Sequence, residues 1–126
     1  MLSWLIAVAA AADIAEIDIA TLQAKREAGE IAVLLDVRTE KEIIEVRVPG
    51  IVHIPLDQLP KRLDELDKET PVHVICHSGG RSAKATELLG AEGFTATNVA
   101  GGTAAWVAAG YAVERGPLDL EATPAE

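Results

Sequence analysis

Residues 72–82, VHVICHSGGRS, decide how the rest of this 126-residue chain is interpreted. The β-branched apolar run that ends at Cys76 predicts a central β-strand. Gly79 and Gly80 can adopt positive φ and so allow a tight loop, after which the pattern predicts a helix over residues 81–92. In open α/β sheets, ligands bind at the carboxyl ends of the strands. This strand, loop and helix therefore predict a ligand site at Cys76.

Apolar runs on both sides of this unit alternate with helical patterns, as expected for βαβ units. Residues 32–37 are almost continuously apolar, which is typical of a parallel strand covered on both faces. Thr39 can cap a helix over residues 40–45, and leucines spaced by three to four residues predict a helix over 56–66. The remaining expected elements are strands at 16–18, 52–54 and 95–99 and a helix over 102–109. The expected fold is α/β, a five-stranded, mainly parallel sheet with helices on both faces.

The composition limits the classes of protein to which the chain can belong. Its length fits one compact domain with an ordinary hydrophobic core. The single cysteine excludes an intramolecular disulfide and a thiolate zinc cluster, so packing must stabilise the fold. The 11 Lys and Arg residues against 20 Asp and Glu leave a net charge of −9, which repels a phosphate backbone. We therefore expect no nucleic-acid partner.

The two ends of the chain differ in composition from the domain between them. Residues 1–12, MLSWLIAVAAAA, carry no charge, but a bilayer-spanning helix needs about 20 apolar residues. No Lys or Arg precedes this run, as a secretory signal would require. We expect an apolar extension over 1–12 that packs on the domain or on a second copy, a domain over 13–116, and an acidic tail over 117–126. The expected location is cytoplasmic, without membrane association; export and membrane association stay as alternatives because of the apolar N-terminus.

Cys76 lies where several groups favour an anion. The free amides at the start of the following helix, the helix dipole and the Arg81 guanidinium are electropositive, and each lowers the pKa of a neighbouring thiol. Cys76 is therefore predicted to be a reactive thiolate. The loop amides can also converge on the sulfur as an anion-binding nest and hold a second sulfur atom attached to it. The candidate substrate-binding residues are His77, Ser78, Gly79, Gly80 and Ser82.

The Cys76 loop and several further motifs, in order along the chain, resemble the rhodanese family of sulfurtransferases. The motifs span roughly residues 14–114: LLDVR (34–38) followed by Glu40 and Glu42, PG (49–50), HIPL (53–56), CHSGGRS (76–82), AGG (100–102), Trp106 and AG (109–110). The resemblance implies a single rhodanese domain with a parallel five-stranded sheet and Cys76 as the sulfur acceptor. In that family the cysteine attacks the outer sulfur of thiosulfate, releases sulfite, and carries a persulfide until cyanide or a thiol removes it.

The resemblance also implies roles for individual residues. Cys76 is the nucleophile and persulfide site, the backbone amides of residues 77–81 stabilise the anion, and Arg81 orients the incoming sulfonate. Asp36 and Arg38 match a family motif that follows a strand, where a supporting salt bridge is expected. No cofactor or metal is expected beyond the covalent persulfide. The acceptor is cyanide or a thiol, for which thioredoxin and glutathione are candidates.

Two features of the motifs bear on the substrate. Cys76 and Arg81 lie five positions apart, as in sulfurtransferases, whereas the related cell-cycle phosphatases and arsenate reductases use a loop one residue longer. Where many family members have Gly-His-Ile-Pro-Gly-Ala, this chain has VRVPGI over residues 46–51, so the Gly-His pair is missing. This departure leaves the physiological sulfur donor open.

Two alternatives to a sulfurtransferase enzyme remain. A rhodanese-like sulfur-carrier or regulatory module would bind a partner protein and turn over few small molecules. A phosphatase or arsenate reductase is the weaker alternative, because the loop after Cys76 is too short by one residue.

The histidines have structural interpretations. His73 and His77 are separated by roughly 13 Å of extended chain, so no metal site is predicted from their spacing. His53 and His73 are expected to be structural, whereas His77 contributes its backbone amide to the loop.

Several other residues are also expected to have only structural roles. Gly101 and Gly102 precede a predicted helix and are expected to form a tight turn. Trp106 is expected to pack in the core. The acidic residues of the helical patterns are expected to form solvated faces: Glu40, Glu42, Asp64 and Glu65.

Overall fold

Five parallel strands form the centre of the protein, in the order β1-β5-β4-β2-β3. The computed structural model describes residues 13–118, so the expected extension over 1–12 and residues 119–126 of the expected tail lie outside it. The strand bounds are Ala15–Ile17 (β1), Val33–Asp36 (β2), Val52–His53 (β3), Val72–Ile75 (β4) and Ala96–Val99 (β5). The predicted five-stranded sheet is confirmed, and all four strand pairings are parallel.

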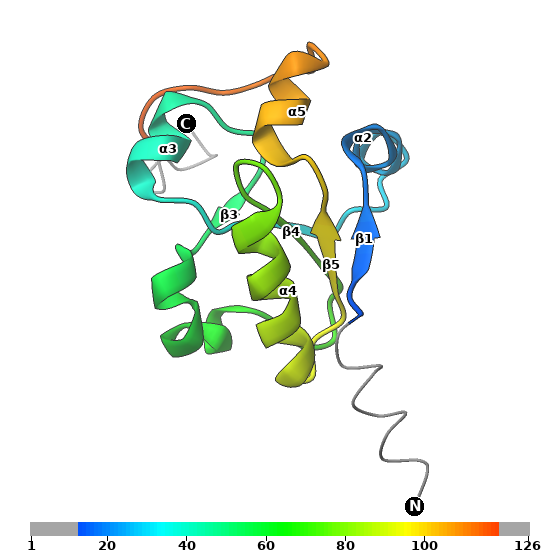
Figure 1. Ribbon diagram of the computed structural model, residues 1–126, viewed down its shortest axis with the longest axis vertical. Helices are drawn as coiled ribbons and strands as arrows, with labels where there is room; N and C mark the ends of the chain where they lie inside the picture. Colours follow the sequence, from blue (N-terminus) through cyan, green and yellow to red (C-terminus); the bar gives the residue numbers. More distant parts are fainter. Residues whose placement is uncertain (1–12, 119–126) are drawn as a thin grey trace, which may run out of the picture.

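Helices cover both faces of this sheet, as predicted. Their bounds are Ile19–Glu27 (α2), Glu40–Glu45 (α3), Gly80–Ala91 (α4) and Gly102–Ala108 (α5), with 3-10 helices at Leu56–Lys61 (η1) and Leu63–Glu65 (η2). Figure 1 shows α4 in front of β4 and β5, with which it is in contact. Because β4 is the middle strand, the loop that follows it lies between the ends of the neighbouring strands.

Two hydrophobic clusters, one on each face, explain the continuous apolar runs of the central strands. The first joins the sheet to α4 and η1 and includes Leu35 and Leu89. The second joins the sheet to α2 and α5 and includes Leu34 and Trp106. Successive residues of a strand point to opposite faces, so Leu34 and Leu35 enter different clusters. Both positions of β2 must therefore be apolar.

The segment 56–66 is not the single helix predicted from its leucines. It forms the two short 3-10 helices η1 and η2, and Pro60 lies inside η1. Proline has no amide hydrogen to donate and its ring obstructs an α-helical turn, so the longer helix cannot continue. The leucine pattern still identified the residues of this segment that face the core. Leu59 is fully buried in the first hydrophobic cluster, and the other three leucines of the pattern pack against that cluster.

Helix α2 was not among the expected elements. It begins after Asp18, whose Oδ1 accepts a hydrogen bond from the Thr21 amide at 2.8 Å. Leu22 is the only fully buried residue of its nine, so the helical periodicity in the sequence is weak. Its position depends on packing beside α5 rather than on a strong apolar stripe.

Helix α3 is held at its end by residues 114–116, which we call the C-terminal strap. A six-residue helix leaves several carbonyls without partners inside the helix. Here Ile43 O accepts from Arg47 Nη1 at 2.9 Å, Ile44 O from the Gly116 amide at 2.7 Å, and Glu45 O from Arg115 Nη1 at 3.0 Å. Arg47 Nη1 also donates to Gly116 O at 2.6 Å, and the Arg47 and Glu114 backbones exchange two hydrogen bonds at 2.9 Å. Arg47, part of the departure from the family motif, therefore binds the strap to α3.

Helix α5 packs its first turn against the loop that contains Cys76. The Thr103 amide donates to Cys76 O at 2.9 Å, and the Ala104 amide donates to His77 O at 3.0 Å. Gly102 has φ +60°, and a Cβ there would lie 2.5 Å from both of these carbonyl oxygens. The tight turn expected at this glycine pair is present, and Gly102 also permits the close contact between α5 and the loop.

We predict that Gly102→Ala destabilises the fold more than Gly110→Ala. Both glycines have positive φ, which costs an L-residue about 1–2 kcal/mol, but a Cβ at Gly110 meets no atom within 4 Å. At Gly102, overpacking against the two carbonyls adds about 1–3 kcal/mol. Urea titrations followed by circular dichroism give the free energies of unfolding. Equal losses in the two variants would show that the α5 contact tolerates a side chain at residue 102.

Candidate active site

Cys76 follows the last residue of β4, and its sulfur faces the start of α4. The residue is 1% exposed, and its Sγ accepts hydrogen bonds from the Gly79 amide at 3.1 Å and from Ser82 Oγ at 3.3 Å. Gly79 caps α4 with φ +110°, a conformation that favours glycine and turns its amide toward the sulfur. The Gly79 amide and the Ser82 hydroxyl are therefore the nearest donors to the sulfur, and the amides of Ser82 and Ser78 act on it as well.

The pKa of the Cys76 thiol lies below its usual value, as a balance of two opposing effects. Burial raises the pKa, because it disfavours the charged thiolate. Hydrogen bonds lower it by a larger total: the Ser82 hydroxyl contributes most, followed by the backbone amides of Ser82, Gly79 and Ser78. The pKa is thus shifted in the predicted direction, and the cause is hydrogen bonding at the first turn of α4; the reactivity of the thiolate stays a prediction.

The other predicted loop residues differ in their relation to the sulfur. Ser82 is fully buried and Gly79 half-buried, and these two donate to Sγ. His77, Ser78 and Gly80 are exposed at the surface of the loop. Within residues 13–118, the amides of His77 and Gly80 make no hydrogen bond to the sulfur, so the nest is smaller than expected. The exposed residues are available to contact a substrate above the thiol.

Arg81 is paired with Glu42 of α3. Its Nη1 and Nη2 donate to the two carboxylate oxygens of Glu42, each at 2.8 Å. These hydrogen bonds are the main cause that lowers the pKa of Glu42 to about 2, partly offset by burial, with hydrogen bonds from Thr39 adding to the shift. They also raise the pKa of Arg81, against the effect of burial, and the Cys76 and Asp36 charges add smaller contributions. The guanidinium expected to orient a sulfonate therefore already binds a carboxylate.

The interpretation of Glu42 as part of a solvated acidic face was wrong. Its side chain is 29% exposed and contacts the arginine of the Cys76 loop. The sequence does contain a signal for its other role, because Thr39 and Glu42 form the capping box of α3. Its contact with Arg81, 39 residues away, depends on the tertiary fold.

Asp36 and Arg38 form the expected salt bridge, beneath the site. Arg38 Nη2 lies 2.9 Å from Asp36 Oδ2, and the two side chains are 2% and 0% exposed. Arg38 Nη2 also donates to Val46 O at 2.8 Å, just beyond the end of α3, and Arg38 O accepts from His53 Nε2 at 2.7 Å. Neither side chain contacts the Cys76 sulfur, which is consistent with a supporting role.

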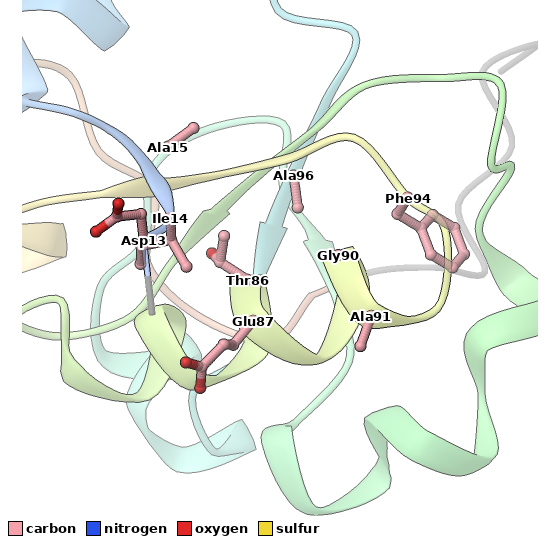
Figure 2. Close-up of a pocket in the computed structure, with 9 residues that line it drawn as sticks. All are labelled: Asp13, Ile14, Ala15, Thr86, Glu87, Gly90, Ala91, Phe94 and Ala96. Carbon is pink, nitrogen blue, oxygen red and sulfur yellow. The ribbon is translucent and has the colours of Figure 1, made fainter. Parts of the chain in front are cut away.

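The hollow shown in Figure 2 lies away from Cys76, between α4 and the β1 edge of the sheet. It has a volume of about 440 Å³. The nine described residues that line it include no cysteine, histidine or cation: they are Asp13, Ile14, Ala15, Thr86, Glu87, Gly90, Ala91, Phe94 and Ala96. These side chains include no thiol and no cation that would bind an anion, so the sulfur chemistry is assigned to the Cys76 loop.

Two negative findings apply to residues 13–118 only. No group of three or more His, Cys, Asp and Glu side chains in this range is arranged to bind a metal ion. No helix in the same range is long and apolar enough to cross a membrane.

We predict that Ser82→Ala raises the pKa of Cys76, because it removes the hydroxyl that donates to the sulfur. Ser78→Ala is the matched control, since Ser78 acts on the thiol through its backbone amide, which the substitution keeps. The pH dependence of Cys76 alkylation by iodoacetamide measures the pKa, because the thiolate is the reacting form. An alkylation midpoint that does not move in Ser82→Ala would contradict the assigned role of the hydroxyl.

Comparison with known proteins agrees with this fold. A family model described as Rhodanese-like domain matches residues 18–109. The "Putative sulfurtransferase YtwF" of Bacillus subtilis (strain 168) is 40% identical over 94 residues, which cover 75% of this chain and 91% of that protein. The "Putative sulfur carrier protein YrkF" of the same organism is 37% identical over 97 residues, which cover 76% of this chain and 52% of that protein.

A solved structure shares the architecture as well. The crystal structure of a rhodanese-like domain protein from Staphylococcus aureus aligns with a TM-score of 0.71 at 34% identity, covering 74% of this chain and 91% of that one. The family match extends from the start of α2 through α5 and includes the complete Cys76 loop. The chain therefore belongs to the rhodanese-like domain family.

Proposed function

We propose that this protein is a sulfurtransferase that moves a sulfane sulfur from thiosulfate, or from a related persulfide donor, to cyanide or a thiol. The observation that carries the proposal is the Cys76 sulfur itself, which accepts two hydrogen bonds and has a lowered pKa. Donors placed around a sulfur anion stabilise a thiolate before the reaction and a persulfide anion after the transfer. Relatives named as a sulfurtransferase and as a sulfur carrier support the same chemistry.

The transfer requires two displacements at sulfur. The Cys76 thiolate attacks the outer sulfur of thiosulfate and forms a new S–S bond, while the old S–S bond breaks and sulfite leaves with its electron pair. Cyanide or a thiolate then attacks the terminal sulfur of the persulfide and restores the Cys76 thiolate. Before the first displacement and after the second, the negative charge lies on the Cys76 sulfur, to which Gly79 and Ser82 donate hydrogen bonds. Atoms and electrons balance without an oxidant, a metal or a cofactor.

The sulfur acceptor in this scheme is a separate molecule. The sequence contains a single cysteine, so no second thiol of the same chain is available to resolve the persulfide. A separate thiol, such as that of glutathione or thioredoxin, can therefore accept the sulfur. A nucleic-acid acceptor is not expected, because the net charge of −9 repels a phosphate backbone. A cytoplasmic location, where such thiols are kept reduced, stays a prediction from the sequence.

A sulfur-carrier module is the second candidate function. The Cys76 residue is 1% exposed, and one relative bears the name of a sulfur carrier protein. Such a module would hold the same persulfide but receive it from a partner protein rather than from thiosulfate. The two candidates therefore share the Cys76 chemistry and differ in their turnover of small molecules, which is low for a carrier module.

We predict that incubation with thiosulfate adds the mass of one sulfur atom to the protein and releases sulfite. The added sulfur should be removed by cyanide or dithiothreitol, because both attack the terminal sulfur of a persulfide. Intact-mass spectrometry and a sulfite assay measure the two products, and Cys76→Ser should give neither. Wild-type protein that takes up one sulfur atom from thiosulfate or from a persulfide donor, but does not turn over with cyanide or a thiol, would favour the carrier module; no gain from either donor would exclude both candidates.

We predict that Arg81→Ala lowers kcat/KM for thiosulfate by at least about tenfold. Loss of a buried donor to a developing anion commonly costs 10²–10³-fold, and about tenfold is expected here because the Arg81 side chain is 38% exposed and partly screened. Lys84→Ala is the matched control, since it removes an exposed cation from the same helix. Steady-state kinetics measure kcat/KM. An unchanged kcat/KM in Arg81→Ala would show that Arg81 has a structural role only.

A further inference from the structure

The charge of Arg81 is already neutralised when no substrate is bound. Both terminal nitrogens of its guanidinium bind Glu42, each at 2.8 Å, so the edge of the guanidinium that would bind a sulfonate through two N–H groups is used by a carboxylate. An incoming dianion must therefore displace the Glu42 carboxylate from Arg81 or share the guanidinium with it. The Glu42 charge repels the dianion in either case.

Glu42 is held in this position by its own helix. The Thr39 amide and the Thr39 hydroxyl both donate to Glu42 Oε1 at 3.0 Å, and the Glu42 amide donates to Thr39 Oγ1 at 3.3 Å. Helix α3 is fixed in turn by Arg38 and by the C-terminal strap. The carboxylate stays ionised at neutral pH, because its pKa is about 2. Glu42 is therefore a permanent negative charge at the edge of the Cys76 loop.

We propose that Glu42 is a positioning residue that selects sulfur donors by charge, through its hold on Arg81. It disfavours dianionic donors such as thiosulfate relative to persulfides of thiols. This proposal rests on the proposed sulfurtransferase function and names the donor class. With a persulfide donor R–S–SH, the Cys76 thiolate attacks the terminal sulfur, the S–S bond breaks, and RS⁻ leaves with the electron pair. No sulfonate has to reach Arg81 in that reaction.

The kinetic test compares Glu42→Gln with Glu40→Gln. Gln at residue 42 keeps an oxygen that can accept from Thr39 but loses the charge; Glu40 lies exposed on the same helix, so its variant is the control for net charge. In Glu42→Gln, KM for thiosulfate should fall about fivefold, the upper range for a partly exposed ion pair, while KM for the persulfide of an uncharged thiol such as 2-mercaptoethanol changes less than about twofold. Glu40→Gln should leave both values unchanged. An unchanged or raised KM for thiosulfate in Glu42→Gln overturns the proposal.

A second readout does not depend on sulfur transfer. Iodoacetate and iodoacetamide alkylate the same thiolate but differ in charge, so the ratio of their rates at Cys76 measures how the site receives an anion. The ratio should rise about fivefold in Glu42→Gln and stay constant in Glu40→Gln. A constant ratio in Glu42→Gln overturns the proposal. A raised ratio in a protein that accepts sulfur from no donor would overturn the proposed function while supporting the charge selection.

The reciprocal variant tests the same pair if Glu42→Gln is too unstable to assay. Arg81→Gln leaves the Glu42 carboxylate without its partner, so KM for thiosulfate should rise and the alkylation ratio should fall. Thermal unfolding of each variant, followed by circular dichroism, establishes that the compared proteins are folded. A fall in KM for thiosulfate in Arg81→Gln would overturn the proposal.

Discussion

The buried guanidinium of Arg38 connects the sheet to the helix that faces the active site. It binds the Asp36 carboxylate at the end of β2 and the carbonyl of Val46 just after α3. Loss of one partner from a buried ion pair costs about 3–5 kcal/mol, because the remaining charge is left without compensation. Exposed pairs on the surface are screened by water and contribute little. Arg38 thus connects the end of β2 to the end of α3 through buried contacts.

The position of α3 matters because the site is built from two separate elements. The start of α4 supplies the donors to the Cys76 sulfur, whereas α3 supplies the carboxylate that binds Arg81. The first set of contacts lowers the pKa of the Cys76 thiol, and the second neutralises the Arg81 charge. The C-terminal strap is bound to α3 by Arg47, although the strap lies about 70 residues after this helix in the sequence. The pKa of the thiol and the partner of Arg81 are therefore set by different parts of the fold.

Much of this fold could be predicted from local patterns. All five strands were expected close to where they lie, and Thr39 correctly predicted the start of α3, because strand burial and helix capping are encoded by neighbouring residues. The helix expected over residues 56–66 was wrong, since Pro60 interrupts a pattern of leucines that is otherwise helical. Helix α2 was missed because a single residue, Leu22, is fully buried along it. In these two segments, backbone chemistry and tertiary packing outweighed the apolar periodicity.

The sequence by itself determined the α/β architecture, the rhodanese-like motifs and the placement of Cys76 at the carboxyl end of a central strand. These features depend on residues close together in the chain, where periodicity, glycine conformations and helix starts act. Only the tertiary structure decided the partner of Arg81, the contact that requires Gly102, and the attachment of the strap to α3. These contacts join residues far apart in sequence, so their geometry exists only after the sheet has brought α3, α4 and α5 together. The position of Cys76 at the end of a central strand is therefore predicted from the sequence, whereas the charged and hydrogen-bonding groups around it are brought together by the fold.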